Sequence, residues 1–123
     1  MNIKEQIIAL YNDPRRNYEV QDRELFNSFV NALNRGEIRS CEKGSTGWIV
    51  NTWVKMGILL GFRLGQLSEL PAYPGKNFYE KDTMPEKRFS LADKVRIVPG
   101  GSSVRTGAYI AELLQVEAAQ IVS

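Results

Sequence analysis

The first third of the chain carries apolar residues at the three- and four-residue spacing of amphipathic helices. Residues 3–12 form one such stretch, in which Asn2 and Glu5 have the spacing of a capping box and Pro14 follows as a stop signal. A second stretch closes at Gly36, which can take the left-handed conformation that ends a helix. Its apolar face consists of Leu25, Phe26, Phe29, Val30 and Leu33. The pattern predicts two helices packed as an antiparallel pair.

A β-hairpin and a third helix are expected next. Residues 38–43 and 48–50 read as strands, and the glycine-containing segment 44–47 reads as their four-residue loop. Asn51 or Thr52 can then accept a hydrogen bond from the free amides of a new helix. This helix is apolar on most of its circumference, so we expect it to be buried in a core or against another subunit. Its apolar residues are Trp53, Val54, Ile58, Leu59, Leu60 and Phe62.

The pattern becomes irregular after this helix. Several glycines and prolines break any period over residues 65–77, which we expect to be a loop. Residues 77–80 could be a short extended piece, residues 81–87 an exposed connector and residues 94–98 a short strand. The predicted fold class is therefore α+β, with a helical hairpin, a short β-hairpin, a buried third helix, and then loops and short strands.

Composition excludes several classes of protein. The apolar fraction of 43% and the charged fraction of 24% are ordinary for a globular domain, and no apolar run reaches the ~18 residues that cross a bilayer. We therefore expect no membrane partner and a cytoplasmic location. The single cysteine, Cys41, and the absence of histidine argue against a disulfide or a metal site. The net charge of +2, mixed in sign, argues against a nucleic-acid partner.

Two pairs of residues permit more than one interpretation. Trp48 and Trp53 could form a stacking platform for a base, but no basic stripe accompanies them, and packing in the core is favoured for both. Gly57 and Gly61 have the spacing of a membrane-helix contact, although the apolar segment around them is too short for a span. Close packing of helices in a soluble core is the favoured interpretation of this glycine pair.

From about residue 32 to residue 111 the chain resembles the N-terminal region of tetrahydrodipicolinate N-succinyltransferase, an enzyme of the succinylase branch of diaminopimelate and lysine biosynthesis. Several spaced tryptophans, glycines and arginines agree together, which makes the resemblance specific. The matching strings are Ala-Leu-x-x-Gly-x-Ile-Arg-x-x-Glu-Lys from Ala32, Gly-Trp-x-Val-Asn-x-Trp-Val-Lys from Gly47, Ile-Leu-Leu-x-Phe-Arg from Ile58, and the segments 78–81, 95–99 and 104–111.

The resemblance implies a catalytic body made of a left-handed β-helix, in which six-residue units stack into triangular coils. Val104 and Ile110, six residues apart, look like the opening of its first coil. After Ala111 the sequence departs from the family pattern, and residues 110–121 have instead the composition and a partial apolar face of a helix. We expect residues 1–99 to form the N-terminal helical domain and residues 100–123 to be a linker, an incomplete coil and a divergent tail.

The resemblance also implies a reaction in which the amine of a dicarboxylate substrate attacks the thioester of succinyl-CoA. In the family the acidic residues that serve the amine, and the groove for coenzyme A, lie on the β-helix, so we expect no catalytic and no cofactor-binding residue in this chain. Arg96 aligns with a family arginine that contacts the substrate, and a guanidinium suits a carboxylate. The alternative is that Arg96 is a solvated strand residue or an ion-pair partner. Arg105 is a second candidate, for which a structural role is favoured.

Two functional hypotheses follow. The first is the N-terminal domain of a tetrahydrodipicolinate N-succinyltransferase-like protein, homo-oligomeric because the family is trimeric, and inactive alone because the β-helix half is missing. The second is a stand-alone, non-catalytic module for oligomerisation or protein interaction, derived from the family. In this second hypothesis the tail forms a helix that covers the surface once capped by the β-helix.

Overall fold

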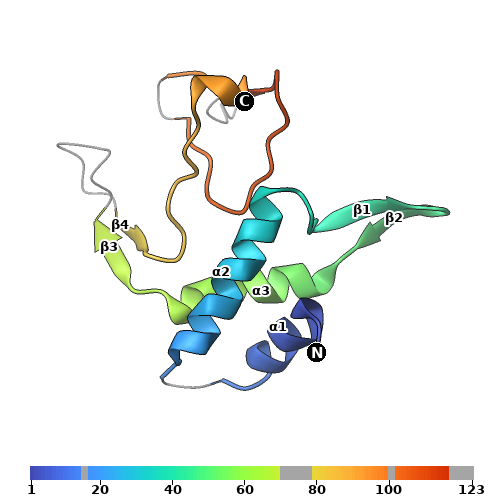
Figure 1. The fold of residues 1–123 in the computed structure, drawn as a ribbon, viewed down its shortest axis with the longest axis vertical. Helices are drawn as coiled ribbons and strands as arrows, with labels where there is room; N and C mark the ends of the chain where they lie inside the picture. Colours follow the sequence, from blue (N-terminus) through green and yellow to red (C-terminus); the bar gives the residue numbers. More distant parts are fainter. Residues whose placement is uncertain (15–16, 70–78, 100–101, 117–123) are drawn as a thin grey trace, which may run out of the picture.

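The structure is a computed structural model that describes residues 1–14, 17–69, 79–99 and 102–116. It has an α+β architecture in which three helices form the core and short strand pairs extend from it (Figure 1). The helices are α1 (Ile3–Tyr11), α2 (Val20–Asn34), α3 (Thr52–Leu64) and the short 3-10 helix η1 (Leu91–Asp93). The strands are β1 (Cys41–Gly44), β2 (Gly47–Val50), β3 (Leu67–Glu69), β4 (Tyr79–Lys81), β5 (Arg96–Ile97) and β6 (Gln115–Val116).

The ends of α1 and α2 confirm the local signals in the sequence. The Asn2 side chain accepts a hydrogen bond from the Glu5 amide at 2.8 Å, which satisfies one of the free donors at the start of α1. At the start of α2 the Glu19 amide donates to the Asp22 carboxylate at 2.8 Å. Gly36 has a φ of +74°, so the left-handed residue that the sequence predicts after α2 is present.

The core lies where the three helices meet, with α1 packed against both α2 and α3. Gly57 and Gly61 place the α3 backbone directly against α2, because a Cβ atom at either position would collide with the ring of Phe29 or Phe26. Close helix packing, the favoured interpretation of this glycine pair, is therefore confirmed. The buried core residues are Ile7, Leu10, Phe26, Phe29, Leu33, Val54, Leu60, Leu64 and Met84.

The last turn of α3 is completed by side chains from distant parts of the chain. Arg23 donates to the carbonyl of Leu64 at 2.8 Å, and the Thr83 hydroxyl donates to the carbonyl of Gly61 at 2.5 Å. Lys81 donates to the carbonyl of Gly65, the residue after the helix, at 3.2 Å. The bonds from Arg23 and Lys81 satisfy carbonyls that the helix end leaves without intrahelical partners, and the bond from Thr83 adds to the one that the Gly61 carbonyl accepts from the Gly65 amide.

The β1–β2 hairpin exists but differs from the expectation in two respects. Gly44 pairs with Gly47, so the loop has two residues instead of four, and β1 begins at Cys41 instead of residue 38. The hairpin projects away from the helices (Figure 1), and Trp48 is 71% exposed. The core position predicted for Trp48 is therefore wrong, because no element lies beneath the hairpin among the described residues. Trp53 does pack against the core, with its ring centroid 5.7 Å from that of Phe29.

Helix α3 is buried on one face within this chain, and burial of its other face against another subunit stays a prediction. The helices α1 and α2 cover its inner side, whereas Ile58, Leu59 and Phe62 on its outer side remain partly exposed. Asn51 precedes α3 but makes no side-chain cap. Its amide group donates instead to the carbonyl of Arg39 at 2.8 Å, which ties the start of α3 to the segment before β1.

The second half of the chain contains pairing that the sequence analysis missed. β3 lies within the predicted loop and pairs antiparallel with β4, with Leu67 opposite Lys81. The short strand predicted over residues 94–98 is present as β5, and it pairs in parallel with β6. The helix predicted for the tail is wrong in its described part, where residues 112–113 form a turn and β6 follows; residues 117–121 lie outside the described residues.

No coil of a β-helix is seen in residues 102–116. Residues 104–107 pack onto the helical domain instead of stacking on a neighbouring coil. The Lys87 amide donates to the Val104 carbonyl at 2.8 Å, and the Thr106 amide donates to the Pro85 carbonyl at 2.9 Å. In the ranges that the structure describes, no helix combines the length and the apolar character needed to cross a lipid bilayer.

Candidate functional site

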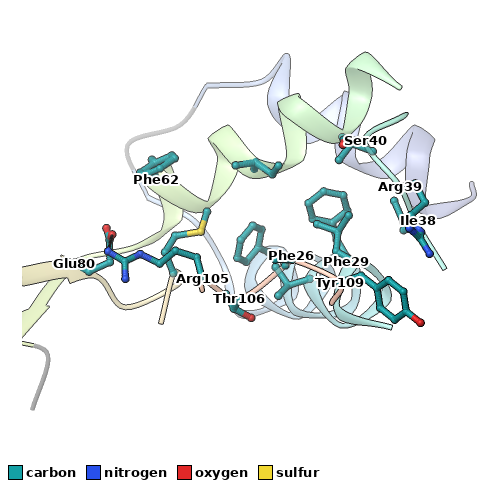
Figure 2. Close-up of a pocket in the computed structure, with 17 residues that line it drawn as sticks. Phe26, Phe29, Ile38, Arg39, Ser40, Phe62, Glu80, Arg105, Thr106 and Tyr109 are labelled. Carbon is teal, nitrogen blue, oxygen red and sulfur yellow. Dashed lines mark ion pairs between the residues drawn. The ribbon is translucent and has the colours of Figure 1, made fainter. Parts of the chain in front are cut away.

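A cavity of about 510 Å³ lies between α2, α3 and residues 105–109. Figure 2 shows Phe26 and Phe29 in its middle, Glu80 and Arg105 at one end, and Arg39 and Tyr109 at the other. Its volume falls in the range of roughly 300–1,000 Å³ that is typical of small-molecule sites. Further apolar side chains that line it are Val30, Leu33, Ile38, Val54, Ile58, Phe62 and Met84.

The wall formed by residues 105–109 is fixed to the end of α2 by one asparagine. The Asn34 side chain donates to the Thr106 hydroxyl at 2.9 Å and accepts from the Gly107 amide at 2.7 Å. Both ends of the amide group are therefore used, and they hold two consecutive residues of the wall. Gly107 has a φ of +95°, a conformation that glycine adopts without strain.

Lys87 reinforces the same wall. Its ammonium group donates to the carbonyls of Asn34, at 3.2 Å, and of Ala108. Burial lowers the pKa of Lys87, and the nearby Asp93 opposes this shift. The two carbonyl bonds occupy the ammonium group in joining α2 to the wall, so we assign Lys87 a structural part in the site.

Arg105 stands at one end of the cavity, where its guanidinium group forms ion pairs with Glu80 at 3.2 Å and Glu86 at 3.8 Å (Figure 2 shows the pair with Glu80). This group of one cation and two carboxylates carries a formal net charge of −1. The structural role favoured for Arg105 from the sequence agrees with these pairs. The structure adds that Arg105 borders a cavity, which the sequence did not indicate.

Arg39 stands at the opposite end. Its Nε donates to the Gly36 carbonyl at 3.0 Å, and its guanidinium carbon lies 4.6 Å from the centroid of the Tyr109 ring. These two contacts hold the guanidinium group in one orientation. Among the described residues no carboxylate forms an ion pair with Arg39, in contrast to Arg105. Arg39 belongs to the strings that carry the family resemblance, but nothing in the sequence singled it out as a site residue.

Arg96 lies on β5 and is exposed, outside the set of residues that line the cavity. Its amide donates to the Leu114 carbonyl at 2.9 Å, and its Cα partner in the strand pair is Gln115. The structure therefore does not bring Arg96 together with Arg105, and its role in substrate binding stays a prediction. In the part of the chain that the structure describes, no cluster of three or more histidine, cysteine, aspartate or glutamate residues could hold a metal ion.

Comparisons with known proteins identify relatives of this chain. A family model described as the N-terminal part of tetrahydrodipicolinate N-succinyltransferase matches residues 2–64, which include all three α-helices. The relatives are 2,3,4,5-tetrahydropyridine-2,6-dicarboxylate N-succinyltransferases. The enzyme of Parvibaculum lavamentivorans is 40% identical over 96 residues, that of Nitrobacter hamburgensis 40% over 98 residues, and that of Rickettsia rickettsii 38% over 97 residues.

The alignments cover 72% or 73% of this chain but only 34% of each of these relatives. The chain thus spans about a third of the length of the relatives it matches. With the family model covering the helical core, the chain belongs to the family of tetrahydrodipicolinate N-succinyltransferase N-terminal regions.

Proposed function

We propose that this chain acts as the N-terminal domain of a tetrahydrodipicolinate N-succinyltransferase, in the succinyl-CoA-dependent branch of diaminopimelate and lysine biosynthesis. It contributes substrate-side contacts and subunit packing in the cytoplasm, and it does not catalyse acyl transfer by itself. The observation that carries the proposal is the match over residues 2–64 together with an alignment that spans only 34% of the relatives.

The chemistry of acyl transfer supports the second part of the proposal. The reaction needs a base for the amine proton and donors for the developing oxyanion. Glu80, the carboxylate residue that lines the cavity, is ion-paired with Arg105, and this pairing suits a structural role better than proton abstraction. The proposal therefore assigns the reacting groups to parts of the relatives that lie beyond the aligned region.

The direct test mixes the purified chain with succinyl-CoA and an aminopimelate acceptor and follows the release of free thiol. The Parvibaculum relative serves as the positive control under the same conditions. We expect no release above the rate of spontaneous thioester hydrolysis. Sustained release that saturates with acceptor concentration would disprove the claim that the chain is inactive by itself.

Within this function, Arg96 is proposed to bind one carboxylate of the dicarboxylate substrate. The resemblance aligns Arg96 with a family arginine that contacts the substrate, and paired hydrogen bonds from a guanidinium group fit a carboxylate. The test uses a chimaera in which this chain replaces the aligned part of the Parvibaculum enzyme. Arg96→Gln should raise the KM for the acceptor about tenfold and leave the KM for succinyl-CoA unchanged. The exposed Arg35→Gln serves as the matched control, and equal effects of the two variants would refute the role.

Subunit packing is supported by apolar surface that the described residues leave uncovered. On the hairpin, Trp48 is 71% exposed, Val50 69% and Ile49 51%. We propose that these surfaces contact other subunits of a homo-oligomer, as the family resemblance implies. Sedimentation of the purified chain tests this, because Trp48→Ser combined with Val50→Thr should shift any oligomer to monomer.

The same exposed surfaces favour a second candidate function, a stand-alone module for oligomerisation or protein interaction. Two measurements distinguish these functions: the mass of the purified chain in solution and the activity of the chimaera. A compact, well-defined oligomer together with a chimaera that has no activity favours the module. A chimaera that transfers succinyl groups favours the succinyltransferase domain.

A further inference from the structure

We propose that the cavity between α2, α3 and residues 105–109 binds a small amphipathic carboxylate, with its apolar body on the phenylalanine-lined floor and its carboxylate on Arg39. The chemical class is a monoanion with an aliphatic or aromatic body, such as a medium-chain fatty acid. The inference goes beyond succinyl transfer and does not depend on it, since it concerns uptake of a ligand by the described residues alone.

The floor of the cavity supplies the apolar half of the site. Ile58, Phe62 and Tyr109 line it and remain 38%, 47% and 44% exposed, whereas Phe26 and Phe29, which also line it, are fully buried. An apolar body placed on this floor would remove those three side chains from water. That burial provides the driving force for binding, and it grows with the length of the ligand until the cavity is filled.

The walls are already in place before a ligand arrives. The bonds from Asn34 to Thr106 and Gly107 hold one side, and the packing of Phe29 against Gly57 holds the other. Arg39 is likewise fixed by the Gly36 carbonyl. A site that is ordered in advance loses little conformational entropy when it binds, which favours a ligand of small size.

The charged residues at the two ends of the cavity determine the charge of the ligand that binds and its orientation. At one end the guanidinium group of Arg105 is already paired with Glu80 and Glu86, so it is not available to an incoming carboxylate. At the other end Arg39 has no carboxylate partner among the described residues, and its guanidinium group can form paired hydrogen bonds with an incoming carboxylate. A carboxylate therefore binds at Arg39, and the apolar body extends toward the middle of the cavity.

The test measures binding of hexanoate, octanoate and decanoate to the purified chain by isothermal titration calorimetry, below their micelle concentrations. Each added CH₂ group should lower the Kd about fourfold, the factor expected for burial of one methylene. Octanol, which has the same apolar body and no charge, should bind at least tenfold more weakly than octanoate because it forms no charge-assisted contact with Arg39.

The matched variants are Arg39→Gln and Arg63→Gln. Arg63 makes the same kinds of contact on the other side of the domain, with a bond to the Tyr11 carbonyl at 2.7 Å and its guanidinium carbon 4.3 Å from the Tyr11 ring centroid, but it does not line the cavity. Arg39→Gln should raise the Kd for octanoate about tenfold, the loss of one charge-assisted contact, and Arg63→Gln should leave it unchanged.

Three outcomes would overturn the proposal. The first is no heat of binding for any of the carboxylates. The second is a Kd that does not depend on the chain length of the ligand, or a Kd that changes equally in the two variants. Either result would mean that the carboxylates bind non-specifically to basic surface residues. The third is a stable dimer that buries Ile58 and Phe62 and takes up no carboxylate, which would assign the cavity to a second copy of the chain.

Discussion

Replacing Gly57 by alanine tests a close contact in the core, where α3 lies against α2. An added Cβ atom would collide with the ring of Phe29, which is fully buried. That ring is confined on two sides, by Phe26 at a centroid distance of 6.2 Å and by Trp53 at 5.7 Å, and it borders the cavity on another side. The two helices must separate, or the ring must leave its rotamer.

Two effects of known size oppose each other in this substitution. Overpacking of a filled core costs about 1–3 kcal/mol. Alanine in place of glycine inside a helix contributes about 1 kcal/mol of stability in the opposite direction. Since Phe29 is confined by Phe26 and Trp53, we take the upper half of the overpacking range. Gly57→Ala should therefore lower the free energy of unfolding by about 1–2 kcal/mol.

The assay is urea denaturation followed by far-UV circular dichroism, on Gly57→Ala alone and in a Phe29→Leu background. Leucine removes the ring that the new methyl group would strike. In that background the same substitution should stabilise the chain by up to about 1 kcal/mol, because only the gain in helix propensity remains. The double-mutant cycle should thus show a coupling of about 2 kcal/mol between the two positions.

Two results would refute this reasoning. If Gly57→Ala stabilised the native background by about 1 kcal/mol, the helices would not be in the close contact that the structure describes. If the loss were equal in the two backgrounds, Phe29 would not be the group that the methyl strikes.

Three further predictions concern the cavity wall, an acid-sensitive contact and the hairpin. Asn34→Ala should speed hydrogen exchange at the Gly107 amide and cost about 1–3 kcal/mol with helical content retained; unchanged exchange would show that this bond does not hold the wall. The Gln66 amide donates to Asp82 and holds the pKa of that carboxyl below its ordinary value of 3.8, so this contribution to stability is present above that value and is lost as the pH falls through the lower pKa of the folded chain. Asp82→Asn should flatten the acid side of the curve of unfolding free energy against pH, and an unchanged slope would contradict the assignment. Trp48→Ser should change the free energy of unfolding by no more than about 0.5 kcal/mol in the monomer, measured by urea denaturation, because the side chain is 71% exposed.

The helices could be predicted from the sequence because their signals are local. Asn2 caps α1, Gly36 terminates α2, and the apolar spacing between them marks the faces that become the core. The hairpin was predictable for the same reason, since Gly44 and Gly47 lie within a few residues of the strands they join. In each case the interactions that determine the local structure join residues less than about seven positions apart in the sequence.

The parts that could not be predicted depend on contacts between distant segments. Trp48 has a large apolar side chain of the kind found in cores, but its exposure depends on whether another element lies beneath the hairpin. The tail has good helix propensity, and the pairing of residues 115–116 with residues 96–97 outweighs it. Local propensity is a weak guide wherever such pairing is available.

The cavity illustrates the same limit for the candidate site. Its wall depends on the bond between Asn34 and Gly107, which are 73 residues apart, and on the Arg39 contact with Tyr109. Arginine and asparagine near the end of a helix are common, and nothing in their spacing indicates a partner so far along the chain. Arg105 was noticed from the sequence only because it belongs to the family resemblance.

The bonds that finish α3 have a consequence for synthesis on the ribosome. The region matched by the family model stops at Leu64, yet Thr83 adds a second hydrogen bond to the Gly61 carbonyl, Lys81 donates to the Gly65 carbonyl, and the side chain of Met84 covers Gly61. While residues 81–84 are still inside the exit tunnel, the last turn of α3 should fray in the nascent chain. We therefore expect the smallest autonomous folding unit to extend to at least Met84, some twenty residues past the end of the family match.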